Sequence, residues 1–174
     1  MWSYSKIEGF GFIPVTCFSQ ALTTFIGQNL GAKEYDRAKK GALFGTICGI
    51  GIAEVIGIAV FFFSPYLIAA FGGDQRAIEY GIAEAHTIAL FYCLLAFSHC
   101  MAAIQRGAGR SIVPMFVMII VWCGVRVTYI SIVIRIIPVI NVIYWAYPLT
   151  WFISSVIFLI LFLKTDWIHG LEKQ

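Results

Sequence analysis

Long apolar segments separated by short polar ones run through the whole chain. Dividing the sequence at its charged residues and at its Gly and Pro positions leaves five mainly apolar segments, at residues 7–31, 41–71, 77–105, 111–137 and 142–163. Each reaches the roughly 20 helical residues that a bilayer crossing requires. The pattern predicts an all-α, polytopic transmembrane helix bundle with five spans, forming a single domain over residues 1–174.

Small residues recur at every fourth position of the second segment, which holds a single charge, Glu54. They are Gly41, Gly45, Gly49, Ala53 and Gly57. This spacing places them on one face of a helix, and small side chains let helix backbones approach closely in lipid. We therefore expect this small-residue stripe to be a helix–helix contact face.

Composition supports a membrane protein, and charge indicates its orientation. The chain is 60% hydrophobic and only 12% charged, and its net charge of +3 is too small and scattered to suggest a nucleic-acid partner. Basic residues concentrate in the first and third connections and after the last segment: Lys33, Arg37, Lys39, Lys40, Arg106, Arg110, Lys164 and Lys173. By the positive-inside rule these parts are cytoplasmic, which predicts a cytoplasmic C-terminus, an external loop at residues 72–76 and an external N-terminus.

Capping residues and prolines indicate where the predicted helices begin or bend. Ser111 is placed to cap the fourth helix, whereas Pro14 and Pro148 lie within segments and should bend or interrupt them. The tail at residues 165–174, which contains Trp167, is typical of an interfacial anchor followed by a polar end.

The first segment is the most polar, because Thr16, Gln20, Thr23 and Gly27 recur at helical spacing. Such a stripe is unfavourable against lipid, so it should face other helices or a water-filled cavity. Two interpretations follow: hydrogen bonding between helices, or a wall that contacts a transported substrate.

Three further polar side chains lie deep in the apolar segments. An unpaired charge there costs at least about 2.5 kcal/mol, so Glu54 and Arg126 need partners or water. The simplest arrangement is a Glu54–Arg126 ion pair, and the alternative is a role in ion or substrate binding. His99 could shuttle protons, or it could be a neutral side chain that donates to a neighbouring carbonyl.

Sequence signatures of enzymes and metal sites are absent. Neither a phosphate-binding GxxxxGK[ST] loop, nor a GxSxG elbow, nor an HExxH pair occurs. We interpret the five cysteines as small apolar packing residues: Cys17, Cys48, Cys93, Cys100 and Cys123. No enzymatic activity, metal site or cofactor is therefore expected.

Three motifs resemble one transporter family. Residues 26–33 (Ile-Gly-Gln-Asn-Leu-Gly-Ala-Lys) with 36–41 (Asp-Arg-Ala-Lys-Lys-Gly) resemble a helix–loop junction of the multidrug and toxic compound extrusion (MATE) transporters. Residues 105–111 resemble the loop before the eleventh helix of that family, and residues 147–151 (Tyr-Pro-Leu-Thr-Trp) resemble the start of its twelfth.

The resemblance implies that the five segments are helices eight to twelve of a twelve-helix, two-lobe transporter. The chain would then be a partial, carboxy-terminal lobe whose amino-terminal lobe and seventh helix are missing. Family members exchange Na⁺ or H⁺ for organic, often cationic, compounds by alternating access. Some carry an aspartate on the tenth helix, but the corresponding position here is Leu95.

We therefore expect part of a cation-coupled multidrug efflux antiporter in a bacterial plasma membrane, with the lipid bilayer, the missing lobe and small organic cations as partners. The candidate substrate-lining residues are Thr16, Gln20, Thr23, Glu54, His99 and Arg126. A relative that flips lipid-linked saccharides is a second transport hypothesis. A small five-helix membrane scaffold or assembly protein without transport activity is the alternative from a different class.

Overall fold

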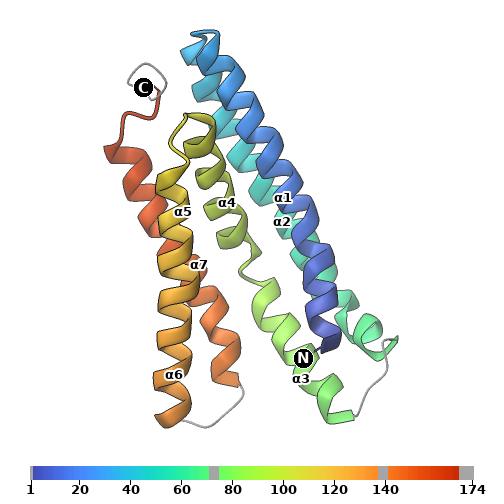
Figure 1. Cartoon of the computed structure of the whole chain (residues 1–174). Coiled ribbons are helices and arrows are strands. Elements are labelled where there is room, and N and C mark those ends of the chain that lie inside the picture. The colour runs from blue at the N-terminus through green and yellow to red at the C-terminus, as the bar shows by residue number, and fades with distance from the viewer. Residues whose placement is uncertain (1, 71–74, 137–140, 169–174) are drawn as a thin grey trace.

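The computed structural model describes residues 2–70, 75–136 and 141–168 (Figure 1), and the described residues contain helices and no strand. In chain order the elements are α1 (Trp2–Gly31), α2 (Tyr35–Ala70), α3 (Gln75–Ala89), α4 (Tyr92–Gly107), α5 (Ile112–Met118), the π-helix η1 (Ile119–Val125), α6 (Arg126–Ile136) and α7 (Asn141–Lys164). The predicted all-α membrane bundle is confirmed.

α1 and α2 run in opposite directions, α3 and α4 together run back, α5 to α6 return, and α7 runs back again (Figure 1). The α1–α2 connection, the α4–α5 connection and the C-terminal end of α7 all lie at the end drawn at the top of Figure 1. Arg110 Nη2 donates to the Asp166 carbonyl at 3.0 Å, which joins two of these segments directly. The three basic regions therefore share one end, which we call the basic end, whereas its cytoplasmic location stays a prediction.

Three helices are long and apolar enough to cross a membrane among the described residues: 35–69, 112–136 and 143–164. The third predicted segment is a broken helix, in which α3 and α4 meet at a 55° bend and together would form a fourth span. α1 is long but less apolar, consistent with its polar stripe. The division into five spans stays a prediction.

Several local expectations change. α2 begins at Tyr35, so Arg37, Lys39 and Lys40 belong to a helix and not to a connection. The break at residues 90–91 carries neither Gly nor Pro. Pro14 and Pro148 interrupt neither α1 nor α7. Ser111 occupies the position before α5 but makes no side-chain cap.

The small-residue stripe is a contact face, as predicted. A Cβ atom added at Gly45 would lie 2.6 Å from the Leu22 side chain of α1, and one at Gly49 would lie 2.6 Å from Cys100 Sγ of α4. At Gly57 it would lie 2.7 Å from the carbonyl oxygen of Ala89. α2 thus approaches α1, α4 and the end of α3 at distances that only small residues permit.

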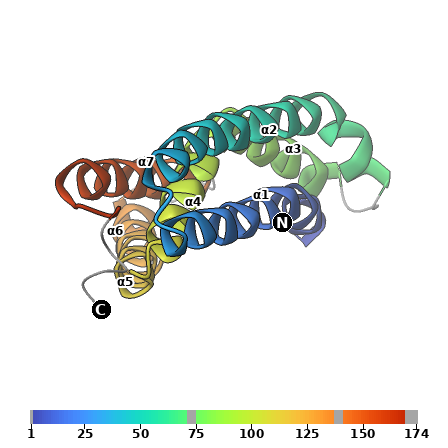
Figure 2. The same ribbon diagram turned by 90° about the horizontal axis from the view of Figure 1, so that it is seen from above.

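α4 is the centre of the bundle. Seen from above (Figure 2), it lies between the α1–α2 pair and the group of α5, α6 and α7. Its residues Ala96, Ala102, Ala103 and Ile104 are fully buried. Because small side chains alternate with large ones along α4, neighbouring helices on several sides can pack against it closely.

Candidate functional site

Two of the predicted site residues meet at one tryptophan. The His99 ring of α4 makes edge-to-face contacts with Phe12 of α1, at 5.1 Å between ring centroids, and with Trp122 of η1, at 5.5 Å. The Arg126 guanidinium carbon lies 5.6 Å from the centroid of the same Trp122 ring and 4.3 Å from that of Tyr147 on α7. We call these five residues the aromatic cluster.

Arg126 does not pair with Glu54. Its Nη2 donates to Thr150 Oγ1 at 2.9 Å, and its guanidinium lies against two aromatic rings. A cation–π contact contributes about 0.5–2 kcal/mol, with the larger values at desolvated sites. Glu54 Oε1 instead accepts the backbone N–H of Cys93 at 3.0 Å. The predicted Glu54–Arg126 ion pair is therefore wrong, because the two side chains bind different helices.

Glu54 acts as a cap for α4, supplied by another helix. The break before Tyr92 leaves the first N–H groups of α4 without intrahelical partners, and Cys93 carries one of them. A carboxylate at a helix N-terminus satisfies such a donor and also interacts favourably with the helix dipole. The half-buried Glu54 carboxylate thus has a backbone N–H as its partner.

His86 plays a similar role near the same break. Pro65 has no N–H to donate to the carbonyl of Phe61, one turn earlier in α2. His86 Nε2 lies 3.0 Å from that carbonyl oxygen, and its ring stacks on the Phe61 ring at 4.2 Å between centroids. α3 is therefore fastened to α2 by a hydrogen bond that the proline makes available.

The polar stripe of α1 divides into two parts. Thr23 Oγ1 lies 3.2 Å from the Ala103 carbonyl of α4, and Gly27 faces the Gly107 carbonyl, so these positions serve helix packing. Thr16 is half-buried and donates to Ile13 within its own helix, while Gln20 is exposed. Thr16 and Gln20 continue the face that carries Phe12, since the three residues are spaced four apart.

His99 differs from the expected arrangement. Its Nε2 is buried, and the ring makes no hydrogen bond to any described residue, so the expected donation to a carbonyl is not observed. Trp122 Nε1 is likewise buried without a hydrogen-bond partner in the described ranges. Buried polar atoms are usually hydrogen-bonded to protein or to ordered water, and these two contacting rings each present one that no described residue satisfies.

Sequence reasoning missed Phe12, Trp122 and Tyr147. The spacing of Trp122 and Arg126, four residues apart, is a signal for a shared helix face. The π-helix that carries Trp122 gives no clear sequence signal, although π-helical turns are frequent at functional sites.

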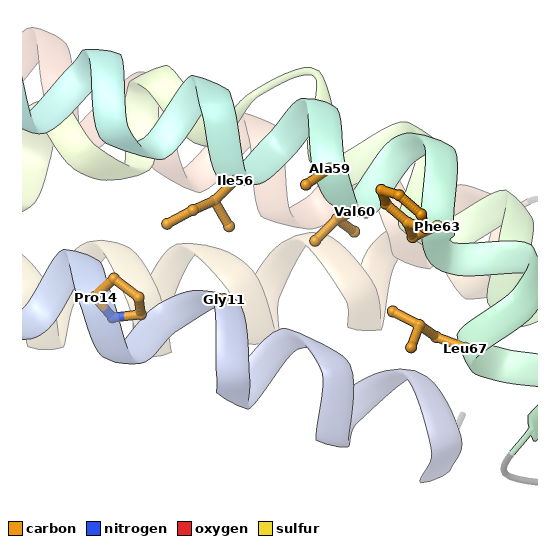
Figure 3. Close-up of a pocket in the computed structure, with 7 residues that line it drawn as sticks. All are labelled: Gly11, Pro14, Ile56, Ala59, Val60, Phe63 and Leu67. Carbon is orange, nitrogen blue, oxygen red and sulfur yellow. The ribbon is translucent and has the colours of Figure 1, made fainter.

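An apolar groove of about 350 Å³ lies between α1 and α2 (Figure 3). Gly11 and Pro14 line it from α1, and Ile56, Ala59, Val60, Phe63 and Leu67 line it from α2. None of these side chains carries a polar group, so the groove can select a ligand by shape and apolar contact only.

Cysteines and metal-binding groups form no site in the described part of the chain. No group of three or more His, Cys, Asp or Glu side chains there is placed to hold a metal ion. All five cysteines are free thiols. Cys100 is buried, as expected for a packing residue, but Cys17 and Cys123 are exposed, so that interpretation was wrong for these two.

Comparison with known proteins agrees with this architecture. The MatE family profile matches residues 3–132. The probable multidrug resistance protein NorM of Thermotoga maritima is 29% identical over 118 residues, which is 67% of this chain and 25% of that protein. The chain thus spans about a quarter of the length of this relative. It is a multi-pass membrane protein, and it belongs to the MatE family.

Proposed function

We propose that this chain forms one part of a cation-coupled multidrug efflux antiporter, in which the aromatic cluster and the adjoining face of α1 form one wall of the translocation cavity. The exported compounds are organic and often cationic, and the coupling ion is Na⁺ or H⁺. The name of the Thermotoga relative and the family membership support the transport class. The chain lies in a bacterial plasma membrane with its C-terminus in the cytoplasm.

The main support is the pair of unsatisfied ring nitrogens in the aromatic cluster. Ligand sites combine apolar and aromatic walls with a few polar groups that fix orientation. His99 Nε2 and Trp122 Nε1 supply such groups, and the rings of Phe12 and Trp122 supply apolar surface. Gln20 extends the polar part of this wall along α1.

Arg126 affects how this wall binds cations. Its guanidinium lies against the rings of Trp122 and Tyr147, where an organic cation would also bind favourably. An arriving cation therefore competes with Arg126 for these rings and is repelled by its charge. Movement of Arg126 off the rings would let the same wall bind a cation in one conformation and release it in another.

The transport test uses the chain together with the amino-terminal lobe of a MatE transporter, reconstituted in vesicles. Trp122→Phe preserves an aromatic ring but removes the indole N–H, so efflux of the organic cation ethidium should fall severalfold while the amount of folded protein stays unchanged. Trp145→Phe is the matched control, because Trp145 is 54% exposed and outside the cluster.

The proposal fails if both variants transport equally well. It also fails if the completed protein moves no organic cation under either a Na⁺ or a proton gradient, a result that would favour the scaffold hypothesis.

Two substitutions distinguish a role of Glu54 in ion coupling from its role as a cap of α4. Glu54→Ala removes the acceptor for Cys93 N–H and should destabilise the fold by about 0.5–2 kcal/mol. Glu54→Gln retains an acceptor oxygen but not the charge. If Glu54 couples an ion, Glu54→Gln should keep its thermal stability and lose gradient-driven efflux. Full efflux in a stable Glu54→Gln variant would limit Glu54 to capping.

A further inference from the structure

A second groove, of about 520 Å³, opens at the basic end of the bundle. It lies between the start of α2, the middle of α4 and the end of α7 with the segment that follows. None of its lining residues belongs to the aromatic cluster, so it is separate from the proposed translocation wall.

The walls of this groove suit a hydrocarbon chain. Leu43, Leu159 and Leu163 line it and are 67%, 44% and 74% exposed, so they face outward from the bundle. Outward-facing apolar side chains on helices that cross a membrane contact acyl chains. Met101 forms part of the inner wall and is almost fully buried.

Trp167 forms one wall of the groove. The sequence predicts that this residue belongs to an interfacial anchor; in the structure it is only 5% exposed, and its indole stacks on Phe162 at 5.4 Å between ring centroids. Trp side chains concentrate at the level of the lipid headgroups. The groove therefore extends from that level towards the apolar interior.

Lys39 is the charged residue of the lining. It is exposed, and it makes no hydrogen bond or ion pair through its side chain with any residue of the described ranges. Within residues 32–40, 106–111 and 164–168, seven basic residues stand against three acidic ones: Glu34, Asp36 and Asp166. The potential at the mouth of the groove is therefore positive, which favours a negatively charged headgroup.

We propose that this groove binds an anionic glycerophospholipid, with its phosphate at Lys39 and one acyl chain along the leucine-lined wall. Basic pockets between transmembrane helices are a known way to recognise anionic headgroups, and each basic residue near the surface contributes about 1 kcal/mol. The volume lies within the range of about 300–1,000 Å³ found for ligand pockets. The inference does not depend on the transport proposal.

Native mass spectrometry of the whole chain in mild detergent tests this site, using phosphatidylglycerol and phosphatidylcholine with identical acyl chains. The chain should retain one phosphatidylglycerol in preference to phosphatidylcholine. Lys39→Gln should reduce that preference about fivefold, which corresponds to about 1 kcal/mol. Lys40→Gln is the matched control: Lys40 is exposed on the same helix but does not line the groove, so its loss weakens only the general positive potential and should reduce the preference clearly less than Lys39→Gln.

A second pair of variants tests the acyl chain. Leu159→Trp should narrow the groove and weaken the binding of both lipids, whereas Val156→Trp, on the same helix but outside the lining, should not. Equal losses for Lys39→Gln and Lys40→Gln would overturn the proposal, and so would unchanged binding in Leu159→Trp. Glycerol 3-phosphate that binds as well as the lipid would show that the acyl chain is not recognised, and retention of neither lipid would indicate that a protein segment covers the groove.

Discussion

Gly57 provides a sharp test of the packing between α2 and the broken third span. A Cβ atom at this position would lie 2.7 Å from the Ala89 carbonyl oxygen and 3.3 Å from Tyr92 Cδ2. Ordinary carbon–oxygen contacts begin at about 3.3 Å, so Gly57→Ala forces backbone to move. Gly51 is the matched control in the same helix, because a Cβ atom there meets nothing within 4 Å.

Gly51→Ala is expected to stabilise the fold, whereas Gly57→Ala is not. Replacing Gly by Ala inside a helix stabilises it by about 1 kcal/mol, and Gly51→Ala should show that gain. At Gly57 the same gain is offset by overpacking, which costs about 1–3 kcal/mol. The two variants should therefore differ in free energy of unfolding by about 1–3 kcal/mol.

Thermal unfolding in detergent, followed by tryptophan fluorescence, measures this difference. For a chain of this size 1 kcal/mol corresponds to about 2–4 °C, so Gly51→Ala should unfold roughly 2–12 °C above Gly57→Ala. If Gly57→Ala unfolds at the same temperature as Gly51→Ala or above it, the close approach of α2 to Ala89 does not limit packing and the argument is wrong.

Three other outcomes are expected. Gly49→Leu should lower the yield of folded protein because its side chain would meet Cys100 and Phe18, whereas Gly51→Leu should not; equal yields would exclude the contact face. Lys33, two residues after the end of α1, has a φ of 60°, so Lys33→Gly should raise the unfolding temperature by roughly 2–8 °C, and a fall would contradict the strain. In a cysteine-free background, a cysteine at Gln75 should react with an impermeant thiol reagent in whole cells and one at Glu34 should not, and the reverse pattern would invert the topology.

The pattern of the sequence was sufficient for the features that depend on local periodicity. Segment length and apolar content identify membrane helices. In the bilayer every backbone N–H and C=O must be hydrogen-bonded, and an α-helix achieves this within a single segment. The small-residue stripe has one small residue at every fourth position, and this spacing predicts a contact face because helix geometry alone places those residues on one side. The clustering of Lys and Arg likewise indicated which connections share an end of the bundle.

The partners of the polar side chains were decided by tertiary structure. The sequence indicates that Glu54 needs compensation, but its partner is a backbone N–H of Cys93, 39 residues away, exposed by a break that no Gly or Pro marks. His99 and Arg126 meet at Trp122 only because the tertiary fold brings the Trp122 ring of η1 against the His99 ring of α4. Helix periodicity sets which residues share a face, whereas the face that each helix turns to its neighbours follows from the packing of the whole bundle.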